Sequence, residues 1–411
     1  MIVTDLRIEP DRLLSRLSAL AEVGAIEGGG VCRLALTDED KVGRELVMAL
    51  MRKLGLDVSI DQMGNVMGRR RGREELTPVY TGSHIDTVRT GGRYDGSLGV
   101  LAGLEVVATL NDANLVTRRP LVVAFFTNEE GARFAPDMMG SMVHQGHLRL
   151  SEALSMRGID GTSVEENLNR LGHAGSLPCG SLRAHAYIEL HIEQGPVLER
   201  EGITIGSVEG VQGISWTEVN IKGVSNHAGT TPMSMRRDAG FAAAAIVRYA
   251  RKLANDVGGD QVATVGYVNL TPNIVNVIPG RASLTVDLRN SDEQRLQFAE
   301  ERLYKFLARL SKREDVYLAR RSLARYEPVA FDEDMIDLVA RHARNLGHTV
   351  KRMPSGAGHD AQAFAPNCPT GMIFVPSVGG LSHNVEEHTH AKDIEAGANV
   401  LLQVLLELAK D

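Results

Sequence analysis

The sequence has 411 residues, which is enough for two domains of ordinary size, and its 43% hydrophobic and 24% charged residues are typical of a globular protein. Lys and Arg total 45 against 52 for Asp and Glu, so the net charge of -7 argues against a nucleic-acid partner. No apolar run is long enough to span a bilayer, so we expect no membrane segment.

The N-terminal segment MIVTDLRIEPDRLLSRL contains acidic residues and lacks the apolar core of a signal peptide. The three cysteines, Cys32, Cys179 and Cys368, are odd in number and far apart, which argues against a disulfide framework. We therefore expect a cytoplasmic protein.

Short apolar runs that end in polar loops alternate with helical patterns along most of the chain. This alternation predicts an α/β fold, with a mixed, mostly parallel sheet flanked by helices. Strands are expected within residues 79–87, 119–131, 184–195 and 371–377, and helices at 97–113 and 391–410.

The strand within residues 184–195 has an informative alternation. The even-numbered residues from Ala186 to Ile192 are apolar and share one face, whereas Glu189, His191 and Glu193 share the other. The second face is therefore a candidate wall of a polar site.

The middle of the chain follows a different pattern. Residues 212–326 predict strand, helix, strand, strand, helix and strand, which is the βαββαβ order of a ferredoxin-like domain. The α/β pattern resumes near Glu327. We therefore expect a discontinuous domain of residues 1–211 and 327–411, interrupted by an inserted domain at 212–326.

Polar clusters stand at the ends of the predicted strands, where ligands of open α/β sheets gather. Imidazoles and carboxylates without cysteine suit zinc or manganese in a catalytic site. The cluster residues are His84, Asp86 and Asp95, then Glu129 and Glu130, then His191, Glu193 and Gln194, and finally His383.

Two spacings within these clusters have a physical use. A carboxylate at Asp86 can accept the second N–H of a metal-binding imidazole at His84. The side chains of Glu129 and Glu130 diverge in extended backbone, so one can bind a metal while the other acts as a general base. Each signal is weak alone, because single histidines are more often surface residues and paired acids more often a solvated loop.

Taken together, the segments resemble the dinuclear metal amidohydrolases of the aminoacylase/carboxypeptidase superfamily. The similarity is greatest to the branch of N-carbamoyl-L-amino acid hydrolases, β-ureidopropionases of that type and allantoate amidohydrolases. It covers nearly the whole chain, through GSHIDTVRTGGRYDGSLGVLAGLE, TNEEGARFAPDMMGS, ELHIEQGPVLE, NHAGTTPMSMRRDA, NIVNVIPG, DLR, SGAGHDA and PSVGGLSHNVEE.

The resemblance implies a zinc-exopeptidase-like domain that holds two divalent metal ions per subunit, zinc or else manganese, cobalt or nickel. Asp95 would bridge the two ions. His84 and His191 would complete the ligands of one ion, and Glu130 and His383 those of the other.

Further roles follow from the same resemblance. Glu129 matches the general base, and Asp86 the partner that orients His84. The inserted domain would act as a lid and dimerisation unit. From it, His227 would stabilise the tetrahedral intermediate in the neighbouring subunit of a homodimer.

Other positions match substrate contacts of the family. Asn276 and Arg289 would hold the substrate carboxylate, a task that suits the planar fork of Arg. Positions that lie near the substrate in the family match Gln194, Gln212, Gly356 and Ala357.

The lid residues also have structural alternatives. Arg289 fits an ion pair with a surface acid, Asn276 fits a turn beside Pro279, and His227 fits a loop cap.

The implied reaction is cleavage of the carbamoyl C–N bond of a small-molecule ureido acid. N-carbamoyl-L-amino acids would give the amino acid, carbon dioxide and ammonia. TNEEGARFAP and GGRYDGSLGVLAGLE resemble the carbamoylases more closely. The alternatives are an allantoate amidohydrolase or another ureido-acid hydrolase, and then an aminoacylase or dipeptidase.

A rival from another class is an NAD-dependent oxidoreductase, because GAGHDA (356–361) fits the dinucleotide fingerprint G-x-G-x-x-A. We expect its context to fail, since the preceding VKRMPS does not read as a buried strand. The pair His388 and His390 reads as a solvated loop. The sequence has neither the G-x-S-x-G of serine hydrolases nor a P-loop.

Overall fold

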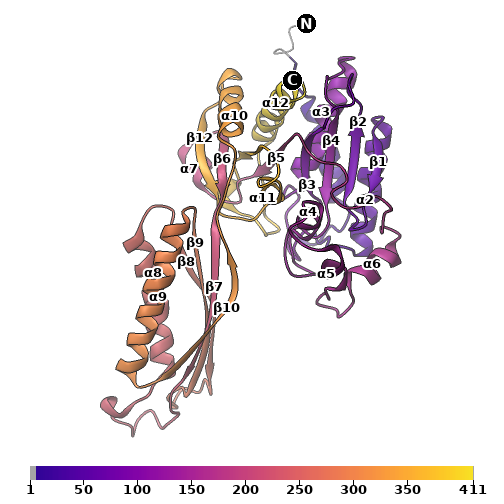
Figure 1. The fold of residues 1–411 in the computed structure, drawn as a ribbon. Helices are drawn as coiled ribbons and strands as arrows, with labels where there is room; N and C mark the ends of the chain where they lie inside the picture. Colours follow the sequence, from indigo (N-terminus) through magenta and orange to yellow (C-terminus); the bar gives the residue numbers. More distant parts are fainter. Residues whose placement is uncertain (1–5, 411) are drawn as a thin grey trace. The chain divides into compact units, whose positions relative to one another are not determined.

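The structure, a computed structural model, describes residues 6–410, which form two compact units (Figure 1). The first unit comprises the residues up to Gly210 and those from Ala330 onward, and the second is Val211–Val329. Each has a hydrophobic core of its own. Residues 1–5 lie outside the described residues. They belong to the N-terminal segment in which we expect no signal peptide.

The first unit is built on a nine-stranded sheet. Its strands are β1 (Asp57–Ile60), β2 (Val66–Arg70), β3 (Val79–His84), β4 (Leu121–Phe126), β5 (Ala186–Ile192), β6 (Ile205–Val211), β11 (Val329–Ala330), β12 (Val350–Ser355) and β13 (Thr370–Val375).

The strand order is β1-β2-β4-β3-β5-β13-β6-β11, with β12 paired to β6. The neighbours β4, β3, β5 and β13 run parallel, whereas β1, β2 and β6 form antiparallel pairs. The predicted α/β fold with a mixed sheet and a parallel centre is therefore confirmed. The pattern did not predict the antiparallel strands, because short amphipathic runs resemble loops.

Helices cover both faces of this sheet. None of the helices within residues 6–410 combines the length and apolar character needed to cross a membrane. The helices of this unit are α1 (Pro10–Ala21), α2 (Asp38–Lys53), α3 (Ser97–Asp112), α4 (Met139–His144), α5 (Leu150–Ser155), α6 (Val164–Leu171), α7 (Val197–Glu201), α10 (Glu333–Asn345), α11 (Ala361–Phe364) and α12 (Ala391–Leu408), with a 3₁₀ turn at Val378–Gly380.

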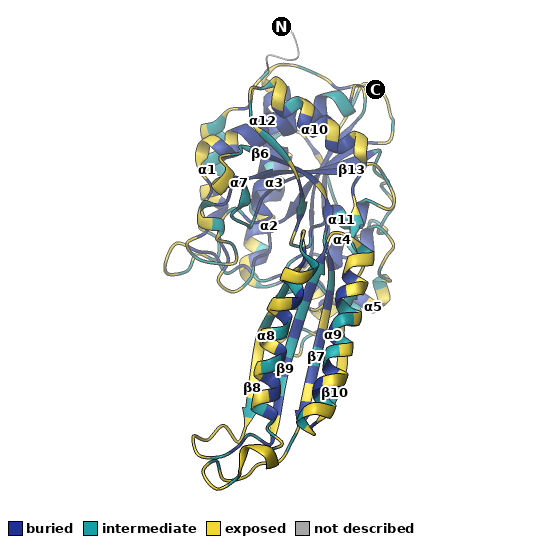
Figure 2. Cartoon of the chain, turned by 90° about the vertical axis from the view of Figure 1, so that its left-hand side faces the viewer, coloured by how far each residue is buried: buried dark blue, intermediate teal, exposed yellow. Residues whose placement is uncertain are grey.

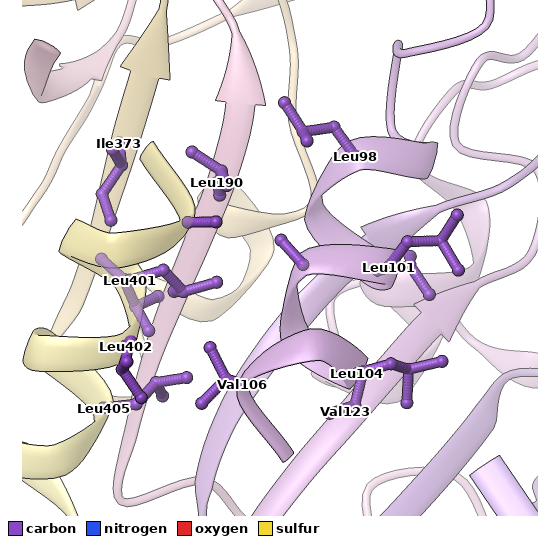
Figure 3. Packing of buried hydrophobic residues seen from close by; sticks show 14 of the residues in the cluster. Leu98, Leu101, Leu104, Val106, Val123, Leu190, Ile373, Leu401, Leu402 and Leu405 are labelled. Carbon is purple, nitrogen blue, oxygen red and sulfur yellow. The ribbon is translucent and has the colours of Figure 1, made fainter. Parts of the chain in front are cut away.

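The main core includes the central strands and the helices α3 and α12. Figure 3 shows Leu401 of α12 beside Leu190 of β5, and Val106 of α3 on the side of that helix that faces them. Every residue of α3 from Ser97 to Leu110 is buried, as expected for a helix that is apolar on all sides. The even-numbered residues from Ala186 to Ile192 all belong to this core, so the predicted alternation of β5 is confirmed. Its other face therefore carries Glu189 and His191.

The second unit contains β7 (Gly213–Lys222), α8 (Ala239–Val257), β8 (Val262–Thr271), β9 (Arg281–Asn290), α9 (Glu293–Glu314) and β10 (Tyr317–Tyr326), with a 3₁₀ turn at Met233–Met235. This is the predicted βαββαβ order. The sheet is antiparallel, in the order β10-β7-β9-β8. Tyr249 of α8 stacks on Phe306 of α9, and the two helices cover the buried side chains of β7 and β9 (Figure 2).

Candidate metal centre

Polar residues from three neighbouring strands meet at one edge of the sheet. His84 is the last residue of β3, His191 lies near the end of β5, and Glu129 and Glu130 follow β4. These strands are parallel, so their carboxyl ends lie together. His383 belongs to the loop that follows β13, the next parallel strand.

Asp95, in the loop between β3 and α3, lies at the centre of the cluster. Its Oδ1 is 3.6 Å from Nε2 of His84 and 3.2 Å from Nε2 of His191. Its Oδ2 is 3.5 Å from Nε2 of His383, and that nitrogen is 3.1 Å from Oε2 of Glu130. Two groups of possible metal ligands therefore share Asp95, one on each carboxylate oxygen.

The donor atoms of each group lie within 4.8 Å of one another, and their chemistry suits a divalent cation. Oε1 of Glu130 is buried and has no hydrogen-bond partner within residues 6–410, an energetic cost that a bound cation would remove. The side chain of His383 is 50% exposed, whereas that of His84 is 2% exposed. The second group is thus open to a ligand, and the first is enclosed.

A third buried group, Glu189, His191 and His359, lies next to the first. His191 turns Nε2 toward Asp95, and its Nδ1 hydrogen-bonds a backbone carbonyl at 2.9 Å. Both carboxylate oxygens of Glu189 already accept hydrogen bonds, from a serine hydroxyl (2.6 Å) and a backbone N–H (3.0 Å). Because these atoms already have partners, we do not read this group as a separate metal site; His359 contacts His191 ring to ring, with centroids 4.5 Å apart.

The carboxylates and imidazoles of the cluster stabilise each other's charged forms. Burial would raise the pKa of Asp95, but the imidazoles of His191 and His84 beside it hold it well below its ordinary value. Burial would lower the pKa of His84, but Glu129 and Asp95 raise it well above its ordinary value. Protons and metal cations would thus compete for the same imidazole nitrogens.

Glu129 and Glu130 turn to different histidines, as their adjacent positions predicted. Oε2 of Glu129 is 3.3 Å from Nε2 of His84, whereas Glu130 faces His383. Burial raises the pKa of Glu129 well above its ordinary value, and the positive charge of His84 offsets this only in part. A carboxyl group with a raised pKa suits proton transfer near neutral pH.

The predicted contact between His84 and the Asp86 carboxylate is wrong. Nδ1 of His84 instead hydrogen-bonds the backbone carbonyl of Asp86, at 2.9 Å. The Asp86 carboxylate accepts the backbone N–H groups of Glu129 (3.3 Å) and Glu130 (3.4 Å). It points away from the imidazole because the neighbouring strand β4 ends there and leaves those two buried N–H groups to be satisfied.

Comparison with known proteins agrees with this geometry. Residues 80–407 match the family described as Peptidase family M20/M25/M40. The chain belongs to this family. Its metal-ligand candidates, from His84 to His383, all fall within the matched residues.

Similar proteins extend over the whole chain. An N-carbamoyl-L-amino-acid amidohydrolase of Rhizobium meliloti is 40% identical over 98% of this chain and 97% of its own length. An allantoate amidohydrolase of Bacillus subtilis is 34% identical over 95% of each chain. The crystal structure of an amidase of the hydantoinase/carbamoylase family from Burkholderia multivorans is 45% identical, with a TM-score of 0.96 over 99% of each chain.

Gln194 also lies at the centre of this M20-family site. It has a positive φ of 58°, and its Nε2 donates a hydrogen bond to Oδ2 of Asp95 at 2.8 Å. Its Oε1 is buried without a hydrogen-bond partner among the described residues, so it remains available to a ligand. Gly356 and Ala357 lie between β12 and α11, where Ser355 Oγ accepts the backbone N–H of Ala357.

The structure around GAGHDA does not support the alternative of an NAD-dependent oxidoreductase. VKRMPS does form a strand, β12, but only Met353 and Ser355 of it are buried, so the expectation that it is not a buried strand holds only in part. The helix after GAGHDA, α11, has four residues and cannot supply the long helix of a dinucleotide fold. His388 and His390 are exposed in the loop before α12, as predicted.

The predicted lid residues belong to the second unit. His227 and Asn276 lie in two loops that meet there, joined by a bridge between His227 and Val277 and by the hydrogen bond from Ala228 N to Asn276 O at 3.0 Å. Both residues are exposed. Nδ1 of His227 accepts the backbone N–H of Gly229 at 3.1 Å.

Arg289 lies on β9, on the side of the sheet that α8 and α9 do not cover. Its Nε and NH2 groups donate to the carboxylate of Asp287, with NH2 at 3.0 Å from Oδ2. The guanidinium also lies 5.9 Å from the ring of Trp216. Gln212 Nε2 makes a longer contact, 3.4 Å, with the backbone carbonyl of Asp260.

Sequence reasoning missed several buried polar residues around the site. Glu387 and Ser382 both contact the Asp95 loop, and Asp360 is buried with its pKa raised to about 8 by burial and by Glu189. All three lie within segments that resemble the family, Asp360 in SGAGHDA and the other two in PSVGGLSHNVEE, and this was the signal that could have found them. Their contacts depend on residues far away in the chain, so these segments alone did not assign them a role.

Proposed function

We propose that this chain is a metal-dependent amidohydrolase that cleaves the carbamoyl C–N bond of N-carbamoyl-L-amino acids. The observation that carries the proposal is the pair of ligand groups that share Asp95, with Glu129 beside them. The named activities of relatives at about 40% identity support the substrate class. The products would be the amino acid, carbon dioxide and ammonia.

The proposed centre holds two divalent ions, zinc or else manganese, cobalt or nickel. His84 and His191 would bind one ion, Glu130 and His383 the other, and Asp95 both. When bound, such ions lower the pKa of water and polarise a carbonyl group.

Proton transfer is assigned to Glu129. Its carboxylate would take a proton from the attacking water and return it to the leaving amine nitrogen. The position of Glu129 supports this role, since its Oε2 lies 3.3 Å from Nε2 of the candidate ligand His84. Asp86 would keep Glu129 in place through the backbone N–H of that residue.

Substrate binding is assigned in part to the second unit. Arg289 and Asn276 would hold the substrate carboxylate, and His227 would stabilise the negative charge that develops on the carbamoyl oxygen. Arg289 is paired with the carboxylate of Asp287, the ion pair that was its structural alternative, so a substrate carboxylate would have to share or displace that contact. Further proposed substrate contacts are Gln194, Gln212, Gly356 and Ala357.

We further propose that the second unit is a lid and the dimerisation surface of a homodimer, with His227 serving the neighbouring subunit's site. β8 supports this proposal, because it is an edge strand of its sheet and edge strands readily pair. Val262, Tyr267 and Val268 of β8 are each about half exposed. The unpaired state of Cys32, Cys179 and Cys368 supports a cytoplasmic location.

A second candidate is hydrolysis of allantoate or a related ureido acid. It is favoured by the allantoate amidohydrolase that is 34% identical over 95% of this chain. Both substrates carry a carboxylate and a ureido group, so the same ligands and the same general base would serve either.

A product-release assay decides among these functions. The zinc-loaded and manganese-loaded protein would be assayed for ammonia release with N-carbamoyl-L-amino acids and allantoate, and for release of the free amino acid with N-acetyl amino acids, which yield no ammonia. We expect turnover of the carbamoyl substrates, loss of activity after chelation and recovery on addition of metal. Full activity in metal-free protein would refute the mechanism, and turnover of allantoate alone would establish the second candidate.

A further inference from the structure

Glu387 is a buried carboxylate that nothing above assigns to the reaction. It is 4% exposed and lies in the loop between His383 and α12. Its Oε1 accepts two backbone N–H groups, from Tyr94 at 3.1 Å and from Asp95 at 3.2 Å. Glu387 therefore fixes the backbone at Tyr94 and Asp95.

The second oxygen of Glu387 links this loop to the Asp95 side chain. Ser382 Oγ is 3.1 Å from Oε2 of Glu387 and 3.2 Å from Oδ2 of Asp95. Ser382 directly precedes His383. One hydroxyl between two carboxylates thus ties the His383 loop to the Asp95 loop.

The surrounding backbone is adapted to Glu387. A Cβ atom at Gly92 would overlap the Glu387 side chain, so glycine is required at that position. His383 has a positive φ of 54°, which is uncommon for residues other than glycine and needs support from its surroundings. Glu387 and Ser382 supply such support on one side of His383.

We propose that Glu387 is a positioning residue, which holds Asp95 and His383 at the separation that lets both bind one cation. The inference rests on the proposed metal-dependent function. It predicts that the ion held by Asp95, Glu130 and His383 depends on Glu387 more strongly than the other ion does. His84 and His191 belong to strands of the central sheet, whereas His383 lies in the loop between β13 and α12.

Zinc titration of chelator-treated protein by calorimetry, together with thermal melting, tests this inference. Loss of one step in His383→Ala identifies the zinc-binding step that belongs to Asp95, Glu130 and His383. In Glu387→Ala we expect that step to lose about 10- to 100-fold in affinity, the usual effect of removing a residue that orients a ligand. The other step should change much less. Glu387→Gln keeps an oxygen for the two N–H groups and should lose less affinity than the alanine variant.

Asp61 offers a matched control for the loss of stability. Its Oδ1 also accepts two backbone N–H groups, from Met63 and Asn65 at 2.9 Å, and its Oδ2 accepts a side-chain donor. It is fully buried and contacts none of the proposed ligands. Asp61→Ala should lower the melting temperature and leave the ratio of the two zinc constants unchanged.

The outcomes separate the inference from the function on which it rests. If the wild type binds no zinc, the proposed function fails. If the wild type binds two ions and Glu387→Ala binds both equally well, or weakens both steps to the same degree, the positioning role is refuted. If Glu387→Ala does not fold, Ser382→Ala tests the inference instead. It removes only the hydroxyl and should selectively weaken binding of the zinc held by Asp95, Glu130 and His383.

Discussion

The Asp86 carboxylate accepts the backbone N–H of Glu129 at 3.3 Å, across 43 residues of sequence. Asp86 therefore acts on the proposed general base through the backbone, and also on Glu130 by the same means. Its contact with His84 is made by its carbonyl, which any residue could provide. The carboxylate thus orders the loop that carries both glutamates.

Replacement of Asp86 should accordingly affect the reaction more than the ligand His84. In Asp86→Ala we expect a fall in kcat of about 10- to 100-fold, because Glu129 and Glu130 lose their backbone anchor. Asp86→Asn keeps one acceptor oxygen and should be milder. Steady-state kinetics and zinc content would be measured, and unchanged kcat in Asp86→Ala would contradict this role.

Asp95 should be indispensable to both ions. Asp95→Ala is expected to bind no zinc tightly, since both ligand groups lose a shared donor. His383→Ala should keep one ion, held by His84, Asp95 and His191. Elemental analysis of the purified variants gives the zinc stoichiometry, and two bound ions in Asp95→Ala would refute the bridging role.

Glu129 and Glu130 should differ in what they control. Glu129→Gln is expected to retain zinc while turnover falls by about 100-fold or more, the usual scale for loss of a general base. Glu130→Gln should lose one ion, because its carboxylate faces His383. Zinc content and kcat measured side by side would distinguish the two, and loss of metal from Glu129→Gln would reassign it as a ligand.

Arg289 should matter only for substrates that carry a carboxylate. A charge-assisted hydrogen bond contributes about 1.5–3 kcal/mol, so Arg289→Ala should raise KM for a carbamoyl amino acid by about tenfold or more. Arg325→Ala is a matched control, because Arg325 pairs with Glu293 and Glu300 in the same unit. An equal loss on the uncharged amide analogue would remove the proposed role.

The fluorescence of the single tryptophan, Trp216, should report the binding of a substrate carboxylate by Arg289. Trp216 lies 5.9 Å from the Arg289 guanidinium, so carboxylate binding there should change its fluorescence. The change should disappear in Arg289→Ala.

The edge strand β8 should carry the proposed dimer contact. Val268 is 47% exposed on β8, and a glutamate there would place unpaired charges on both copies of the interface. We expect Val268→Glu to be monomeric by light scattering at concentrations where the wild type is a dimer. Val42→Glu, at an exposed valine of the first unit, is the control and should leave the mass unchanged.

Local patterns were sufficient for the central parallel strands, for the helices α3 and α12, and for the candidate metal ligands. Burial of one face of β5 follows from its alternation, and α3 from its long apolar run. The ends of β3, β4 and β5 were recognisable because each apolar run stops at polar residues. The antiparallel strands β1, β2 and β6 were missed, since their pairing partners supply much of their stability.

The sequence by itself determined the α/β class, the inserted βαββαβ order and the residue types gathered at the strand ends, because these depend on periodicity and local spacing. Only the tertiary structure decided that the Asp86 carboxylate serves Glu129 and not His84. It alone brought Glu387 to Asp95, across 292 residues. The reason is physical: a buried carboxylate turns to whichever unsatisfied N–H groups the fold places beside it, and sequence spacing does not encode that choice.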